Sequence, residues 1–258
     1  MAIIIAIEGN IGSGKSTMVD FLKTQYNNKI LFGRKVIFLQ EPVKQWEEIC
    51  SDGVNILEKF YANQEKWAFS FQMMAYISRL DILRKAVKEN PNGIIFTERS
   101  LFTDKNVFAQ MLYDDKKINE IDFQIYNKWF HSFIEEVPIS GIVYIKTDPE
   151  TCSSRVEKRA RKGETIPLEY LTQCSHYHDN WIINKEPESG KLILDGNVDN
   201  VENPSIINTW LKSISDFTET LVKKSDNEKN YENKFCYYDA PVASNCYQEQ
   251  KFPFHNNF

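Results

Sequence analysis

A phosphate-binding loop near the N-terminus constrains the fold more than any other feature of this 258-residue chain. Residues 9–16 read GNIGSGKS and match the pattern G-x-x-x-x-G-K-[ST] at every fixed position. An apolar run at 3–7 predicts a short buried strand before the loop, and residues 17–26 predict a helix after it. This order presents backbone N–H groups and a helix N-terminus to an anion. The sequence therefore predicts binding of a nucleoside triphosphate, in preference to a chance match in a glycine–serine turn.

Two side chains of this loop have predicted roles in phosphate binding. Lys15 is long enough to reach the outer phosphates of a nucleotide, and the Ser16 hydroxyl can hold Mg²⁺. The glycines let the backbone close around the phosphates. The nucleotide-binding residues predicted for this segment are Gly9, Asn10, Ile11, Gly12, Ser13, Gly14, Lys15, Ser16 and Thr17.

Short apolar runs alternate with helical patterns along the rest of the chain. Further strands are expected at 35–40, 93–97, 141–146 and 191–195. Helices are expected near 54–66, 68–89, 104–113, 119–136, 149–161, 167–185 and 204–223. Such alternation predicts an α/β fold with a five-stranded parallel sheet and helices on both faces, whose ligands bind at the carboxyl ends of the strands. The phosphate-binding loop, Glu41 and residues 98–99 follow predicted strands and are therefore expected at one site.

Charge and cysteine content argue against several classes of protein. The formal net charge of −5 and the pI near 5.5 disfavour a general nucleic-acid-binding surface, which needs a basic face. The five cysteines are scattered without a C-x-x-C pair, so neither a disulfide framework nor a zinc site is expected. The N-terminal apolar run is too short for a membrane span, and no signal or transit peptide is evident. We therefore expect a cytoplasmic protein without nucleic-acid or membrane partners.

Two carboxylates and an arginine follow the second and third predicted strands. Glu41 begins the segment EPVKQW, and a carboxylate facing the phosphate loop can accept the proton of a hydroxyl group that receives a phosphate. Taken alone, Glu41 also fits a surface carboxylate. Arg99 can neutralise charge on a transferring phosphoryl group, and Glu98 can help to hold Mg²⁺ through water. A local ion pair at a strand end is the alternative interpretation of those two residues.

The helix predicted at 68–89 carries Gln72 and Arg79 on one face, because seven residues make almost two full turns. Most of their neighbours on this helix are apolar, so the two polar side chains need partners. A nucleobase edge supplies such partners, since the glutamine amide both donates and accepts while arginine only donates. A solvated polar stripe is the alternative.

A basic cluster lies at the end of the helix predicted at 149–161. Arg155 and Arg159 share a face at four-residue spacing, and Arg161 follows them. In a kinase with a phosphate loop, such a segment closes over the donor and supplies arginines to its phosphates. We expect an arginine-rich lid at about 155–166, in preference to a solvated basic helix.

Residues 225–258 differ in composition from the rest of the chain. They are rich in asparagine and lysine and contain eight aromatic residues without clear periodicity. Aromatic side chains usually pack on a surface. We therefore expect an extension that docks on a main domain at 1–224, in preference to a segment that binds a partner.

Together these segments resemble the cellular deoxynucleoside kinases, the family that includes deoxycytidine, deoxyguanosine and mitochondrial thymidine kinases. The resemblance covers about residues 1–185. The shared features are GNIGSGKS, the EPV segment with Trp46, Tyr61 before Trp67, FQ at 71–72, ERS at 98–100, Asp104, the lid arginines and IPLEYL at 166–171. The resemblance implies a three-layer P-loop kinase fold and Mg²⁺-dependent transfer of the ATP γ-phosphate to the 5′-hydroxyl of a deoxynucleoside, for dNTP salvage. It also implies a homodimer.

The same resemblance gives roles to individual residues. Glu41 matches the base near the 5′-hydroxyl, Arg99 lies beside that hydroxyl, and Lys15 completes the catalytic set. Tyr61 and Glu164 match the pair that holds the sugar 3′-hydroxyl. The other residues that it places at the substrate are Val43, Trp46, Phe71, Gln72, Ala75, Arg79, Asp104 and Phe108. Those that it places at ATP and Mg²⁺ include Arg155, Arg159, Arg161, Ser16 and Glu98.

The preferred base is predicted from Arg79 and Asp104, which resemble the pair in the deoxycytidine and deoxyguanosine kinase branch. A charged pair occupies the space that the thymine methyl group needs. We therefore expect deoxycytidine or purine deoxynucleosides to be preferred over thymidine.

Two other functions compete with this interpretation. A nucleoside monophosphate kinase needs arginines for the acceptor phosphate, whereas Gln72 and Tyr61 suit an uncharged base and sugar. A non-catalytic scaffold subunit with the same fold would be expected to lose Lys15, Glu41 or Arg99, and all three are present.

Overall fold

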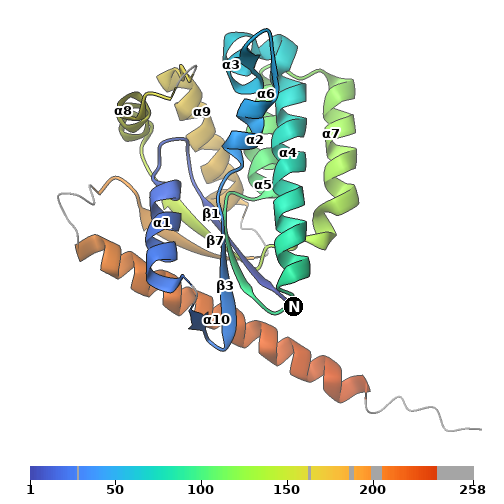
Figure 1. Cartoon of the computed structure of the whole chain (residues 1–258), viewed down its shortest axis with the longest axis vertical. Helices are drawn as coiled ribbons and strands as arrows, with labels where there is room; N and C mark the ends of the chain where they lie inside the picture. The colour runs from blue at the N-terminus through green and yellow to red at the C-terminus, as the bar shows by residue number, and fades with distance from the viewer. Residues whose placement is uncertain (28, 162–163, 186–188, 199–204, 237–258) are drawn as a thin grey trace, which may run out of the picture.

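A sheet built from the predicted apolar runs forms the middle layer of the protein (Figure 1). The computed structural model describes residues 1–27, 29–161, 164–185, 189–198 and 205–236. The main sheet has the strand order β2-β3-β6-β1-β7-β8. Its strands are β1 Ile3–Glu8, β2 Ile30–Leu31, β3 Arg34–Leu39, β6 Ile94–Glu98, β7 Gly141–Lys146 and β8 Gly190–Asp195.

Five of these strands run parallel, namely β3, β6, β1, β7 and β8, which confirms the predicted parallel arrangement, although the whole sheet has six strands instead of the predicted five. β2 adds an antiparallel edge by pairing with β3. A separate hairpin consists of β4 (Cys50–Ser51) and β5 (Val54–Asn55). These three additional strands have two residues each, which is too short for a hydrophobic period to appear in the sequence.

Helices connect the parallel strands and cover both faces of the sheet (Figure 1). The α-helices are α1 Lys15–Tyr26, α2 Val43–Glu48, α3 Ile56–Ala62, α4 Gln64–Glu89, α5 Leu101–Thr103, α6 Gln110–Asp114, α7 Glu120–Phe133, α8 Pro149–Arg159, α9 Leu168–Asp179 and α10 Ser205–Cys236. Two π-helical segments, η1 Asp104–Ala109 and η3 Asn180–Asn184, and the 3₁₀ turn η2 Ile134–Glu136 complete the set.

Strand β1 contributes to hydrophobic cores on both faces, because successive side chains of a strand point in opposite directions. Ile5 packs in one core with Met18 of α1 and Leu221 of α10. Ile4 packs in the other core with Tyr76 of α4. Every residue of β1 and β6 is buried, as expected for central strands of a parallel sheet. The three-layer arrangement predicted from the sequence is confirmed.

The helices predicted at 54–66 and 68–89 meet at Asn63 instead of residue 67. The Asn63 side chain accepts a hydrogen bond from the backbone N–H of Lys66 and thereby caps the N-terminus of α4. Farther along, the helix predicted at 104–113 begins with the π-helical segment η1, which contains Asp104 and Phe108. A π-helical turn rotates the side chains that follow it relative to an α-helix, and such turns are frequent at functional sites.

Helix α10 packs on the same face of the sheet as α1 and continues beyond the end predicted at residue 223 (Figure 1). Arg34 forms an ion pair of 2.5 Å with Asp226 on this helix. The domain boundary predicted at residue 225 thus falls inside a helix, while residues 237–258 of the predicted extension lie outside the described residues. The division into a domain and an extension stays a prediction. Within the described residues, each helix is too short or too polar to cross a bilayer.

Candidate active site

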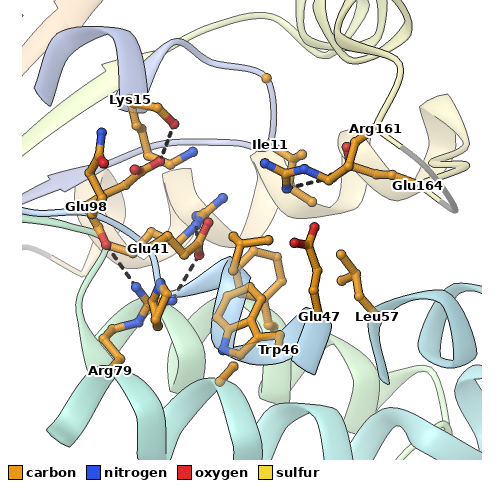
Figure 2. Close-up of a pocket in the computed structure, with 18 of the residues that line it drawn as sticks. Ile11, Lys15, Glu41, Trp46, Glu47, Leu57, Arg79, Glu98, Arg161 and Glu164 are labelled. Atoms are coloured by element: carbon orange, nitrogen blue, oxygen red, sulfur yellow. Dashed lines mark hydrogen bonds and ion pairs between the residues drawn. The ribbon is translucent and has the colours of Figure 1, made fainter. Parts of the chain in front are cut away.

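A cavity of about 860 Å³ opens at the carboxyl ends of β1, β3 and β6. Figure 2 shows Lys15, Glu98, Glu41 and Arg79 on one side of it and Arg161 on the other. The predicted site residues that line the cavity are Ile11, Gly12, Gly14, Lys15, Ser16, Thr17, Glu41, Val43, Trp46, Tyr61, Phe71, Gln72, Ala75, Arg79, Glu98, Arg99, Asp104, Phe108, Arg155, Arg159, Arg161 and Glu164. Predicted residues outside this lining are Gly9, Asn10 and Ser13.

The backbone of the phosphate-binding loop requires glycine, as two of its positions illustrate. Gly12 and Gly14 have positive φ angles of 81° and 100°, which favour glycine. A Cβ atom at Gly12 would also lie 2.6 Å from the backbone oxygen of Cys152 on α8. The loop is therefore packed directly against the helix that carries the lid arginines.

Lys15 is buried in this loop, and its Nζ donates a hydrogen bond of 2.6 Å to the backbone oxygen of Asn10. Burial, together with the nearby positive charge of Arg99, lowers the pKa of Lys15 to about 8. Asn10 in turn donates to the backbone oxygen of Leu171 at 2.8 Å, which links the loop to α9. Asn10 is thus a structural residue of the loop, and Lys15 is free to exchange its carbonyl partner for a phosphate oxygen.

The Ser16 hydroxyl donates a hydrogen bond of 2.6 Å to Oε1 of Glu98, which ends strand β6. This contact brings together the two residues predicted to hold Mg²⁺. Both provide oxygen atoms, which Mg²⁺ prefers as ligands. The arrangement fits a cation that takes its remaining ligands from water and nucleotide phosphates.

Glu41 and Arg79 lie at the centre of a buried ionic network. Nη2 of Arg79 lies 3.0 Å from Oε1 of Glu41, and Nε of Arg79 lies 2.9 Å from Oδ2 of Asp104. Nε of Arg99 approaches the same Glu41 oxygen at 3.2 Å. Burial by itself would raise the pKa of Glu41, but the two guanidinium groups lower it to about 2. Glu41 is therefore a carboxylate at neutral pH.

Arg99 is held in a left-handed backbone conformation, with a φ angle of 63°. Its N–H donates to the backbone oxygen of Ile7 at 3.0 Å, and its carbonyl oxygen accepts from the Thr97 hydroxyl at 3.0 Å. Its Nη1 donates to the backbone oxygen of Gly9 at 2.9 Å. A strained backbone persists where its surroundings fix it, and such residues cluster at active sites.

Aromatic side chains and an amide form another part of the cavity wall. Phe71 makes an edge contact with Trp46, at 5.5 Å between ring centroids, and stacks on Phe60 at 4.7 Å. The buried Gln72 amide oxygen has no hydrogen-bond partner among the described residues. An unpaired buried acceptor in a cavity is suited to a polar ligand.

Glu164 belongs to the predicted lid at 155–166. Residues 162–163 of this segment lie outside the described residues. The buried carboxylate of Glu164 forms ion pairs of 2.5 Å with Arg159 and 3.7 Å with Arg161. Burial raises the pKa of Tyr61, and the negative charge of Glu164 adds to the effect. The predicted sugar-binding pair thus occurs at the same end of the cavity as the lid arginines.

Two buried residues close to Arg99 were missed by the sequence analysis. Glu8 accepts hydrogen bonds from the Ser100 hydroxyl, at 2.6 Å, and from the Thr103 hydroxyl, and burial raises its pKa. Glu8 could have been found from the sequence, because it places a carboxylate at the end of the first apolar run. His178 on α9 contacts the Arg99 guanidinium, and nothing in the pattern of that helix distinguishes this histidine.

A phosphate-binding loop on a parallel sheet, facing a carboxylate and buried arginines, defines a P-loop kinase. Residues 5–234 match the family model described as deoxynucleoside kinase. The chain is 34% identical over 224 residues to a probable deoxycytidine kinase of fowlpox virus (strain NVSL), covering 84% of this chain and 88% of the relative. It is 32% identical over 247 residues to deoxycytidine kinase 1 of Xenopus laevis, with coverages of 84% and 91%.

A mitochondrial deoxyguanosine kinase of Xenopus laevis is 30% identical over 204 residues, covering 71% of this chain and 74% of the relative. The chain belongs to the deoxynucleoside kinase family and is an ATP-dependent enzyme of that family. The family predicted from the motifs is therefore confirmed, and the scaffold alternative is set aside.

Proposed function

We propose that the protein transfers the γ-phosphate of ATP, with Mg²⁺, to the 5′-hydroxyl of a deoxynucleoside, with deoxycytidine or purine deoxynucleosides preferred over thymidine. The product is the deoxynucleoside monophosphate, for dNTP salvage. The observation that carries this proposal is the Glu41 carboxylate, held by Arg79 and Arg99 in the same cavity as Lys15. The names of the relatives, deoxycytidine and deoxyguanosine kinases, support this class of acceptor.

Glu41 is the proposed acceptor for the proton of the 5′-hydroxyl. As that proton leaves, the hydroxyl oxygen bonds to the γ-phosphorus. The bond from the γ-phosphorus to the oxygen that bridges to the β-phosphate breaks, and ADP leaves with the electron pair. Arg99 and Lys15 line the same cavity and stabilise negative charge on the transferring group. The low pKa of Glu41 keeps this residue ionised, so it can accept a hydrogen bond from the hydroxyl.

Ser16 and Glu98 are the proposed magnesium-binding residues. Their oxygen atoms lie 2.6 Å apart, and Mg²⁺ commonly binds to one or two protein oxygens together with substrate phosphates and water. Within the described residues, no cluster of three or more His, Cys, Asp or Glu side chains could hold a metal alone, which fits a cation that arrives with the nucleotide. When bound, Mg²⁺ neutralises charge on the phosphate oxygens.

Gln72 and Arg79 are the proposed readers of the base. Nη1 of Arg79 donates to the backbone oxygen of Glu98 at 2.9 Å, and its other nitrogens face Asp104 and Glu41. The guanidinium is thus fixed on three sides and cannot swing away from a bulky substituent. A thymine methyl group beside this buried polar pair would gain no apolar contact and would crowd it.

Tyr61 and Glu164 are the proposed partners of the sugar 3′-hydroxyl. Both line the same cavity as Glu41, and Glu164 is already paired with lid arginines. A 3′-hydroxyl that donates to this carboxylate would share it with Arg159. The proposed lid would then close over the donor when the nucleoside is present.

The proposed quaternary structure is a homodimer, and the proposed location is the cytoplasm. Apolar side chains on the outer surface of α4 and α7 support an interface there. Among the described residues, Cys50, Cys152 and Cys174 are free thiols, which fits a reducing compartment. We propose no nucleic-acid or membrane partner, in line with the acidic net charge.

The test is phosphate transfer from ATP and Mg²⁺ to deoxycytidine, deoxyadenosine, deoxyguanosine and thymidine, measured in parallel. A Lys15→Ala variant serves as the blank, because it removes a buried ammonium group from the phosphate loop. We expect turnover that the variant loses, with thymidine as the poorest acceptor. Thymidine as the best acceptor would contradict the proposed base preference. Absence of turnover with all four, in folded protein that binds ATP, would overturn the proposed reaction.

A further inference from the structure

His178 lies behind Arg99, outside the lining of the cavity. Its side chain is fully buried, and it stacks on Tyr144 with ring centroids 6.0 Å apart and planes within 4°. The edge of Phe108, which lines the cavity, packs against the same imidazole at 6.4 Å. A buried histidine in contact with a proposed catalytic arginine needs an explanation that packing alone does not supply.

The protonation state of His178 follows from its two hydrogen-bond partners. Nδ1 lies 2.7 Å from the backbone oxygen of Cys174. A carbonyl oxygen only accepts, so Nδ1 must carry the proton. Nε2 lies 3.5 Å from Nη1 of Arg99, which only donates, so Nε2 must present its lone pair. Burial and the charge of Arg99 lower the pKa of His178 well below its usual range, and the imidazole is therefore neutral.

Four groups of the protein hold the Arg99 guanidinium. Nε faces Glu41 at 3.2 Å, and Nη1 is shared between the Gly9 carbonyl and His178. The ring of Phe108 lies under the guanidinium carbon at 4.9 Å. Within the described part of the chain, Nη2 has no hydrogen-bond partner. The guanidinium is therefore anchored along one edge and keeps two N–H groups for a ligand.

We propose that His178 is a positioning residue for Arg99, and that its neutral Nε2 orients the guanidinium toward the transferring phosphoryl group. A carboxylate in the same place would also accept from Nη1, but its negative charge would offset the charge that Arg99 brings to the phosphate. A neutral imidazole holds the guanidinium without this loss. This inference rests on the role of Arg99 proposed above.

Two amide substitutions separate this role from simple packing. The amide of His178→Gln reaches the place of Nε2 and can still accept from Arg99, but it loses the bond to Cys174. The amide of His178→Asn ends at the place of Nδ1, so it keeps the Cys174 bond and loses the acceptor for Arg99. If His178 positions Arg99, kcat falls by about tenfold in His178→Asn and by less than about threefold in His178→Gln, since a misplaced catalytic group costs up to roughly 100-fold. The KM for ATP and for the nucleoside changes little.

The matched control is His176→Gln on the same helix, where the side chain is exposed, and it should leave kcat unchanged. A double-mutant cycle supplies the second readout. Once Arg99→Ala has removed the guanidinium, adding His178→Asn should lower kcat no further. Thermal unfolding and ATP binding of each variant show whether it is folded.

Each outcome bears on a different claim. Activity better preserved in His178→Asn than in His178→Gln would show that the Cys174 bond matters, and it would overturn the positioning role. If His178→Asn lowers kcat as much in the Arg99→Ala background as in the unmodified protein, the positioning role is likewise overturned. Full kcat in Arg99→Ala itself would instead refute the proposed role of Arg99, whatever the histidine variants do. If His178→Asn does not fold, the cycle is run with His178→Phe, which keeps a ring against Tyr144 but offers Arg99 no acceptor, and its loss of kcat must vanish in the Arg99→Ala background.

Discussion

Glu41 is the residue on which the proposed chemistry depends, and its surroundings decide how it acts. Two guanidinium groups lie within 3.2 Å of one carboxylate oxygen and hold its pKa at about 2. Such a carboxylate is a weak base in the ground state. In a loose phosphoryl-transfer transition state the hydroxyl needs little proton removal before it attacks, so an ionised acceptor in the right place is sufficient.

Replacing Glu41 by glutamine tests this role. The amide keeps the size of the side chain but cannot take the proton, so we expect kcat to fall at least about tenfold, the low end of general-base effects. ATP binding, measured by calorimetry, should persist because Lys15 and the phosphate loop are intact. Unchanged kcat would remove Glu41 from the mechanism.

The lowered pKa of Lys15 predicts that the activity depends on pH in the alkaline range. Its pKa of about 8 in the free protein is lowered from the ordinary value of 10.5, so the ammonium form is lost as the pH rises through 8. We expect kcat/KM for ATP to fall above about pH 8. Bound phosphates favour the charged form, so kcat at saturating ATP should hold to higher pH. If kcat/KM for ATP and kcat both remain constant up to pH 9.5, this contradicts the role given to the lowered pKa of Lys15.

The charged pair of Arg79 and Asp104 predicts the base preference. Replacing Arg79 by methionine alone would leave Asp104 buried without its partner, which typically costs about 3–5 kcal/mol of stability. Arg79→Met is therefore combined with Asp104→Asn, and Asp104→Asn alone is the control. We expect the ratio of kcat/KM for thymidine to that for deoxycytidine to rise at least about tenfold, because space and an apolar contact replace a charge. An unchanged ratio would move base selection to other residues.

At the scale of elements, helices and strands with a strong hydrophobic pattern were predictable from the sequence, and short segments were not. The continuous apolar residues of β1 and β6 mark central parallel strands, and the phosphate loop marks the turn into α1. Helix α2 has six residues and β2 has two, so neither carries a period long enough to detect. The π-helical segment η1 results from tertiary packing, which local sequence does not record.

The candidate site was predictable where a functional side chain lies at the end of a strand or shortly after it. Glu41 and Glu98 were found in this way, because the ends of parallel strands meet at one edge of the sheet. The strained backbone of Arg99 was not predictable, since it depends on contacts with β1 and the phosphate loop. His178 approaches Arg99 across 79 residues of sequence, and a single sequence holds no signal for such a contact.

The packing of the phosphate loop against α8 predicts different effects for two glycine substitutions. Gly12→Ala combines a φ of 81° with a Cβ placed 2.6 Å from the Cys152 carbonyl, so either the loop or the lid helix must shift. Gly53→Ala is the matched control, because Gly53 has a φ of 73° and nothing within 4 Å of a Cβ. We expect Gly53→Ala to cost about 1–2 kcal/mol of stability, the cost of a left-handed backbone. Gly12→Ala should cost more and should also weaken ATP binding, as calorimetry and thermal unfolding will show. Equal losses in both variants would mean that the contact with α8 is unimportant.

At the scale of the whole molecule, the surfaces of α4 and α7 are unusual for an acidic, charged protein. Ile121, Ile125 and Trp129 recur at four-residue spacing and therefore lie along one side of α7. They are 70%, 42% and 42% exposed, and Ile77 on the neighbouring helix α4 is 45% exposed. The two helices lie side by side at the edge of the molecule away from α1 (Figure 1). A second copy of the chain would cover this apolar face with its own copy of the same face. Two-fold dimers pair identical surfaces in this way.

This arrangement predicts a dimer that a single charge disrupts. We expect sedimentation equilibrium at micromolar concentration to give about twice the chain mass of 30.2 kDa. Ile121→Glu should shift the mass toward the monomer, because it places a charge on the apolar face where partners would bury it. Ile193→Glu is the matched control, since Ile193 is 43% exposed on β8, away from α7, and this variant should remain dimeric. A monomeric unmodified protein would refute the homodimer. A dimer that withstands Ile121→Glu but dissociates in Ile193→Glu would place the interface at the β8 edge of the sheet instead.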